Sequence, residues 1–178
     1  IEKSIDLRGP NYGVSAGVAP GVRVPEAVIV FPAGLTDYQE MIFIDAENVK
    51  VDGFTLDGQA LAEDVDIAGI VSEEKNLTVK NNIIKNFNYI GILSSSYEFV
   101  GGSWDRTFYN TGLLIENNLV TNEVPGRYYN YSAIYVQGDN GVVRGNVVDK
   151  AYRGIQIQPY GNPETAQGLV ENNEVRGY

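Results

Sequence analysis

Short segments in which apolar and polar residues alternate recur along the chain. The clearest is 77–86 (LTVKNNIIKN), with similar copies at 113–120, 142–148 and 169–175 and a weaker copy at 49–56. Alternation with a period of two predicts β-strands. Units this short cannot bury their apolar side alone, so the copies are expected to stack into one continuous core.

Aligning the five segments gives two apolar columns with a polar column between them. The apolar columns are Val51, Val79, Ile115, Val143 and Val170, and Leu56, Ile84, Val120, Val148 and Val175. The column between them is Phe54, Asn82, Asn118, Asn146 and Asn173, with spacings of 28, 36, 28 and 27 residues. Spacings of this size are typical of solenoids.

The asparagine column has a structural reason of its own. Asparagine tolerates the left-handed backbone at a turn between two strands. One asparagine per coil, stacked about 4.8 Å apart, allows neighbouring amides to bond to each other. Ordinary surface turns are the alternative, but agreement at three offsets favours a ladder of Asn82, Asn118, Asn146 and Asn173.

A second alternating segment precedes each copy, so each coil is expected to hold three short strands. Isoleucine recurs at one position of these leading strands, as Ile42, Ile70, Ile92, Ile134 and Ile155. If the isoleucines point inward, alternation exposes two outer rows. These rows are Phe43, Val71, Leu93, Tyr135 and Gln156, and Asp45, Glu73, Ser95, Gln137 and Gln158. The segment 11–26 lacks clear periodicity and is expected to cross the end or side of the stack as a loop.

These repeats resemble the right-handed parallel β-helix of the pectate lyase-like superfamily over nearly the whole chain. The resemblance implies an all-β fold, a right-handed parallel β-helix of about six coils with three short parallel sheets. The length suits a single domain over residues 1–178. The resemblance implies no particular activity, because the same scaffold carries lyases, hydrolases, adhesins and surface-array proteins.

Composition excludes several classes of function. The net charge is −10, with 13 basic against 23 acidic residues, which argues against nucleic-acid binding. No stretch is apolar enough to span a bilayer. The chain has no cysteine and no histidine, so it cannot supply a disulfide, a thiolate metal site or a Ser-His-Asp triad. A composition rich in Gly, Asn and Tyr and poor in Lys favours a secreted or cell-surface protein.

Two acidic residues of one outer row, Asp45 and Glu73, are candidate catalytic groups. They fall in neighbouring coils, so their carboxylates are expected to lie close together. Paired carboxylates serve glycoside hydrolysis or bind Ca²⁺ through oxygen ligands. The alternative is a pair of solvated surface acids, which is the ordinary state of charges on an outer face.

An acidic insertion before one leading strand gives a candidate calcium site formed by Asp57, Glu63, Asp64 and Asp66. Basic residues of later coils, among them Arg127, are expected nearby. The resemblance to pectate lyases suggests Ca²⁺ held by acidic residues, with an Arg or Lys that removes a proton from an acidic sugar. Arg127 is therefore a third catalytic candidate, although no stretch matches the catalytic motif of those enzymes. The alternative is an acidic loop beside unrelated basic residues.

Aromatic residues in two further insertions, at 97–110 and 121–131, form the candidate substrate-binding surface. Its members, together with one residue of a leading strand, are Tyr97, Trp104, Tyr109, Tyr128, Tyr129 and Tyr135. Tyrosine and tryptophan present flat apolar faces with a polar tip, which suits sugar rings and protein interfaces. The alternative is that these loops fold back to cover apolar coil residues.

The last repeat shows no polar capping unit, although a stack normally needs capped ends. The chain is therefore expected to be a fragment of a longer stack, or a subunit whose coil ends are covered by neighbours. The first functional hypothesis is a non-catalytic extracellular module, structural or adhesive, of a surface or filament-forming protein. The alternatives are a Ca²⁺-assisted lyase acting on an acidic glycan and a module that binds a glycan through the aromatic loops.

Overall fold

The structure is a computed structural model of the 178-residue chain. It describes residues 1–17, 22–32, 34–35, 37–59, 65–95, 98–100, 103–105, 112–123, 131–138, 140–158 and 168–176, with only the backbone for 98–100 and 103–105. Within these residues no helix is long and apolar enough to cross a membrane.

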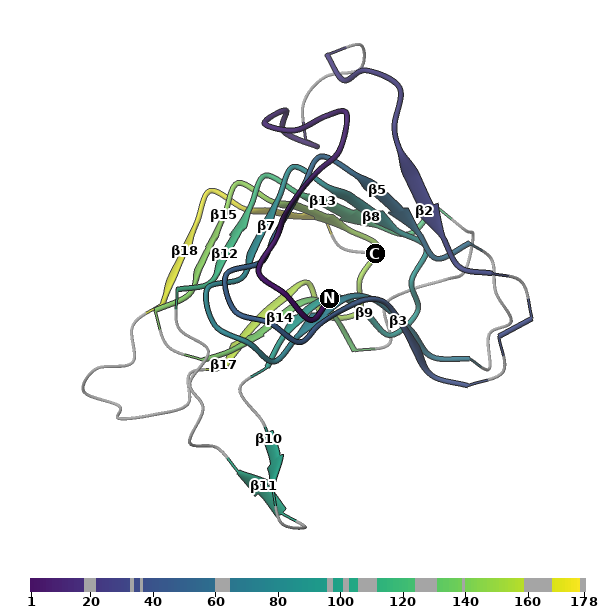
Figure 1. Cartoon of the computed structure of the whole chain (residues 1–178). Helices are drawn as coiled ribbons and strands as arrows, with labels where there is room; N and C mark the ends of the chain where they lie inside the picture. The colour runs from purple at the N-terminus through teal and green to yellow at the C-terminus, as the bar shows by residue number, and fades with distance from the viewer. Residues whose placement is uncertain are drawn as a thin grey trace.

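Three parallel sheets form the sides of a right-handed β-helix (Figure 1). Sheet A contains β1 (Asp6–Arg8), β4 (Lys50–Asp52), β7 (Thr78–Lys80), β12 (Leu114–Glu116), β15 (Val142–Arg144) and β18 (Leu169–Glu171). Sheet B contains β2 (Val28–Val30), β5 (Thr55–Asp57), β8 (Ile83–Lys85), β13 (Leu119–Thr121), β16 (Val147–Asp149) and β19 (Glu174–Arg176). Sheet C contains β3 (Gln39–Ile44), β6 (Ile67–Ser72), β9 (Ile90–Ser94), β14 (Ser132–Gln137) and β17 (Ile155–Gln158). The predicted all-parallel solenoid is confirmed.

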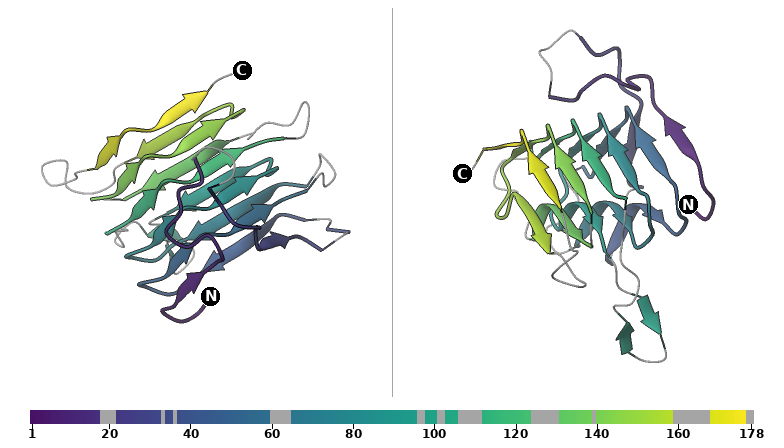
Figure 2. Two further views of the ribbon diagram at one scale, coloured as in Figure 1. Left: turned by 90° about the horizontal axis from the view of Figure 1, so that it is seen from above. Right: turned by 90° about the vertical axis from the view of Figure 1, so that its left-hand side faces the viewer.

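The chain visits the sheets in the order C, A, B in every coil from β3 onward, and β1 and β2 form a preceding coil in sheets A and B. We number the coils 1 to 6 from the β1–β2 coil. Equivalent strands lie side by side from one end of the stack to the other (Figure 2). The predicted apolar columns pair in register, as Val51 with Val79 and Ile115 with Val143. These side chains are fully buried, so the core is continuous through the coils.

The four column asparagines form a hydrogen-bonded ladder inside the stack, as predicted. The Asn118 amide donates to the Val79 carbonyl oxygen and to Asn146 Oδ1, both at 2.9 Å. Asn118 Oδ1 accepts from the backbone N–H of Asn82 at 3.0 Å and from its side-chain amide at 3.2 Å. The same pattern continues to Asn173. At the other end of the ladder, the backbone N–H of Phe54 donates to Asn82 Oδ1. Each buried amide therefore has partners in both neighbouring coils, which offsets the cost of burying it.

The residue before each ladder position turns the chain from sheet A to sheet B with a left-handed backbone. The φ angles lie between 54° and 85° at Gly53, Asn81, Asn117, Gly145 and Asn172. Glycine, and less readily asparagine, adopts this conformation at low cost. At Gly53 an added Cβ would also lie 2.3 Å from the Tyr12 backbone nitrogen, so only glycine fits there.

The described residues of the segment 9–26, which are 9–17 and 22–26 and are here called the strap, follow this corner along the side of the stack. The Ala16 N–H donates to the Asn117 carbonyl oxygen at 3.0 Å, and Arg23 donates to that of Asn81 at 2.9 Å. The Arg23 guanidinium also forms two hydrogen bonds with Glu26 and one with the Val14 carbonyl. The strap thus satisfies corner carbonyl groups of two coils. The prediction that this segment crosses the end or the side of the stack is confirmed, and the described residues lie along the side.

An insertion in coil 4 forms an antiparallel hairpin, β10 (Glu98–Val100) and β11 (Ser103–Asp105), within the segment that was expected to be a loop. The hairpin projects away from the stack on the side of sheet C (Figures 1 and 2). Backbone pairing places Phe99 opposite Trp104.

Candidate functional site

The outer face of sheet C carries a second apolar cluster, separate from the core. Ile70, Ile92 and Ile134 point into the core as predicted. Val71 and Tyr135 point outward, but they are only 4% and 6% exposed. The prediction of two exposed outer rows is therefore wrong at these two positions, and also at Ser95 and Gln137 of the second row, which are 6% and 5% exposed. At Val71 and Tyr135 the cause is a covering layer, since Tyr89, Leu93 and Tyr131 pack against them together with Ala68 and Ile90.

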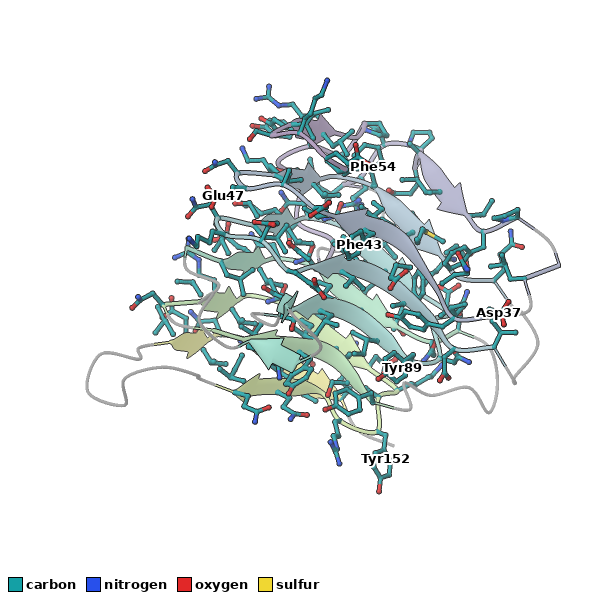
Figure 3. The ribbon with its side chains drawn as sticks, turned by 60° about the horizontal axis from the view of Figure 1, so that its bottom comes forward. Asp37, Phe43, Glu47, Phe54, Tyr89 and Tyr152 are labelled. Atoms are coloured by element: carbon teal, nitrogen blue, oxygen red, sulfur yellow. The ribbon has the colours of Figure 1, made fainter. Side chains whose placement is uncertain are left out.

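Tyrosine rings follow one another across the coils on this face. The ring of Tyr89 lies edge-on to that of Tyr38 at 5.8 Å and is stacked on that of Tyr131 at 5.7 Å. Tyr131 in turn meets Tyr135 edge-on at 5.2 Å. We call Tyr38, Tyr89, Tyr131 and Tyr135 the tyrosine file. Figure 3 shows this side of the molecule, with Phe43 on β3 and Tyr89 immediately before β9.

Neutral polar side chains continue the file toward coil 6. Gln137 Nε2 donates to the Tyr135 hydroxyl at 2.6 Å, and that hydroxyl donates to Gln158 Oε1. Ser95 Oγ donates to Gln137 Oε1 at 3.0 Å. One coil further along, Ser132 Oγ donates to Gln156 Oε1 at 3.1 Å. Ser95, Ser132, Tyr135 and Gln137 are buried, so these bonds are made within the protein. Gln156 and Gln158 are partly exposed, and their amides can bond to a ligand that carries hydroxyl groups.

The two ends of the file differ in charge. At the Tyr38 end, burial raises the pKa of Tyr38, and the negative charges of Glu40 and Asp66 raise it further. Burial, Tyr131 and Asp66 likewise raise the pKa of Tyr89. Both hydroxyls therefore stay protonated and act as donors. At the other end, the Arg153 guanidinium lies 5.5 Å from the ring centre of Tyr131, a cation–π contact.

The two catalytic candidates on sheet C lie in adjacent coils. Asp45 and Glu73 directly follow the registered pair Ile44 and Ser72, and both are exposed. They therefore lie on the same face as the tyrosine file, on the side toward sheet A. Whether they act on a substrate stays a prediction.

The structure separates the two described members of the proposed calcium set. Asp57 is the last residue of β5 and not part of the insertion, which corrects its predicted place. Its carboxylate lies 3.5 Å from Lys85 Nζ and accepts from the Asn86 amide at 2.8 Å. Asp66 instead lies near Tyr38 and Tyr89, where its negative charge raises the pKa of both hydroxyls. Among the described residues no group of three or more acidic side chains is placed to hold a metal ion.

Most of the remaining candidates lie outside the described residues. These are Glu63, Asp64, Tyr97, Tyr109, Arg127, Tyr128 and Tyr129. For Trp104 the structure gives the backbone alone, in β11. Of the proposed binding residues, Tyr135 is the one whose side chain the structure places, and it belongs to the tyrosine file.

Sequence reasoning missed Tyr38 and Tyr89 as part of a binding surface. A signal was present, since Tyr38, Tyr89 and Tyr131 each stand directly before a leading strand, β3, β9 and β14. Asp66 holds the same position before β6. Aligning the residues that enter sheet C, as well as those within it, reveals this column.

The fold and this face define a parallel β-helix protein with an aromatic and polar outer surface on one of its three sheets. The model of one protein family, described as "Protein of unknown function (DUF1565)", matches residues 10–177. The chain belongs to this family. No curated protein and no solved structure matches the chain significantly.

Proposed function

We propose that the protein is a non-catalytic glycan-binding module, adhesive in role, of a secreted or cell-surface β-helix protein. The observation that carries this proposal is the tyrosine file, in which Tyr38 is exposed and Tyr89 and Tyr131 are partly exposed, beside the partly exposed amides of Gln156 and Gln158 on sheet C. Tyrosine rings offer apolar surface to the faces of sugar rings, and their hydroxyls bond to sugar hydroxyls. Side-chain amides complete the set of donors and acceptors that a chain of sugars requires.

The register of the sheet supports a linear ligand. Corresponding positions of adjacent strands of sheet C lie about 4.8 Å apart, from coil 2 to coil 6. A polymer lying across the strands would therefore pass one strand of the face per coil. As part of this proposal, the similarity to pectate lyase-like β-helices also supports a polymer that lies across the strands. A Ca²⁺-assisted lyase stays an alternative prediction, because Arg127, Glu63 and Asp64 lie outside the described residues.

The test compares two tyrosines of nearly equal exposure on different faces. Tyr38 is 43% exposed on sheet C, and Tyr12 is 42% exposed on the strap beside Arg8. A panel of neutral, acidic and amino-sugar oligosaccharides is titrated into the protein by calorimetry. Removing an aromatic anchor typically costs more than about 1.4 kcal/mol, so Tyr38→Ala is expected to weaken binding of the best ligand about tenfold. Tyr12→Ala is expected to leave it unchanged.

Two results would overturn the proposal. One is that no oligosaccharide of the panel binds the unchanged protein. The other is that Tyr38→Ala and Tyr12→Ala bind as well as the unchanged protein does. Release of unsaturated product in the same titrations, followed by ultraviolet absorbance, would favour the lyase instead.

A further inference from the structure

Charge is distributed unevenly along the outer face of sheet C. The acidic residues Glu40 and Asp45 come from coil 2, and Asp66 and Glu73 come from coil 3. From coil 4 onward the described residues of the outer rows are uncharged, as Leu93, Ser95, Tyr135, Gln137, Gln156 and Gln158. The face is therefore acidic at the Tyr38 end and neutral over most of its remaining length.

Acidic residues of the adjacent coils 2 and 3 lie close together at this end. Glu40 pairs in register with Ala68, two residues beyond Asp66, and Asp45 and Glu73 follow a registered pair. Like charges directly opposite each other in adjacent strands are destabilising, and Asp45 and Glu73 are the pair closest to that arrangement. A cationic ligand would relieve this repulsion, whereas a polyanionic ligand would increase it.

The tyrosine rings at the acidic end are also suited to a cation. The face of an aromatic ring attracts an ammonium or guanidinium group, and at the far end of the file the ring of Tyr131 already has Arg153 beside it. Tyr38 has the most exposed ring of the file and lies beside Glu40 and Asp66. The Tyr38 ring and the carboxylates of Glu40 and Asp66 together form a site for one positively charged group.

We propose that the ligand of this face is a glycan with free amino groups, whose ammonium groups lie at Tyr38, Glu40 and Asp66. This inference rests on the proposed function, because the neutral half of the face is assigned to sugar hydroxyls. The partly exposed amides of Gln156 and Gln158 in coil 6 favour a sugar polymer over a basic peptide or a polyamine. Charge complementarity selects the amino sugar among glycans.

The test uses a β-1,4-linked glucosamine hexamer and the same hexamer with every amine acetylated. Calorimetry at low salt and about pH 6, well above ordinary carboxyl pKa values of about 4, keeps the acids ionised. The free-amine hexamer is expected to bind at least tenfold more tightly than the acetylated one. The preference should fall as salt is added, because both acids lie at the surface.

The variant Glu40→Gln/Asp66→Asn is expected to bring the two affinities to within about twofold of each other while the acetylated hexamer binds as before. Glutamine at position 40 can still accept from the Tyr38 hydroxyl, which protects the local structure. The control Asp149→Asn/Glu171→Gln makes the same change in net charge on sheets B and A and should keep the preference. Circular dichroism and the thermal midpoint check that all variants are folded.

The outcomes separate this inference from the proposed function. Equal binding of the two hexamers, with both weakened by Tyr38→Ala, would overturn the inference and leave the glycan-binding function in place. Loss of the preference in the control pair would overturn it as well, since net charge alone would then explain the effect. Failure of every oligosaccharide to bind would overturn both.

Discussion

The outer faces of sheets A and C are formed by the same coils, yet charged residues are arranged differently along them. On sheet A the residue after each core position alternates in sign from coil to coil, as Arg8, Asp52, Lys80, Glu116, Arg144 and Glu171. Lys80 and Arg144 both contact Glu116, at 2.5 Å. On sheet C acidic residues lie in two adjacent coils, and the other described residues of the outer rows are aromatic or neutral, with Arg153 beside the Tyr131 ring.

This difference separates a face that stabilises the stack from the face that we propose as a binding surface. In a solenoid any outer row repeats at the coil spacing, so a row of one sign repels itself and a row of alternating sign binds its coils together. Sheet A takes the second arrangement, and Lys80, Glu116 and Arg144 link three successive coils by ion pairs. Sheet C departs from this arrangement, and such departures are expected at functional sites.

The largest effect is expected from the interior that supports both faces. Asn118→Ala leaves the Val79 carbonyl, the Asn82 N–H and part of the amides of Asn82 and Asn146 without their partners. Each buried group left unsatisfied costs about 1–3 kcal/mol, so a loss of about 4 kcal/mol in the free energy of unfolding is expected. Urea unfolding followed by circular dichroism measures it.

Asn172→Ala is the matched control for the ladder. Asn172 has a left-handed backbone at the same corner but is exposed, so alanine there should cost only about 1 kcal/mol. Equal losses at the two asparagines would mean that the turn, and not the ladder, stabilises the coils that both faces share.

The ladder and the three sheets were predictable from the sequence because they obey fixed offsets. Val79, Asn82 and Ile84 recur with the same spacing in each coil, since strands that stack must keep their register. The alternating charges of sheet A obey the same rule, each lying one residue after a core position. They were visible in the sequence, although they were not used in the prediction.

The tyrosine file on sheet C was harder to predict because one of its residues follows an insertion. Tyr131 follows an insertion that is absent from the neighbouring coil, where Tyr89 follows its core strand closely. Spacing therefore does not align them, and only the stacked structure brings their rings to 5.7 Å. Asp57 was misplaced for a related reason, because the sequence does not show where β5 ends and the insertion begins.

A smaller effect is expected from the charge row of sheet A. Burial alone would raise the pKa of Glu116, but hydrogen bonds from Lys80 and Arg144 outweigh it and hold the pKa below its usual value. Glu116→Gln is expected to cost about 1–2 kcal/mol at neutral pH, because the side chain is only 12% exposed and loses two charged partners.

The pH dependence of this loss follows from the lowered pKa. The stabilisation by ionised Glu116 is fully present above the ordinary carboxyl pKa of about 4.3 and is lost as the pH falls through the lower folded-state pKa. Urea unfolding from neutral pH to about pH 3 should show the curves of Glu116→Gln and the unchanged protein converging at the acidic end. A difference that stays constant with pH would mean that lost packing, and not the ion pairs, explains the effect.

The smallest effect is expected from an ion pair that links no coils. Arg176 and Glu174 pair at 2.7 Å within β19, and both side chains are 57% exposed. Exposed pairs contribute little, because water screens the charges and two long side chains lose freedom. Glu174→Gln should therefore leave the urea midpoint unchanged within the error of the measurement. If Glu174→Gln lost as much free energy of unfolding as Glu116→Gln, the ion pairs of sheet A would not stabilise the protein by linking coils. The contrast between a stabilising sheet A and the proposed binding surface on sheet C would then lose its physical basis.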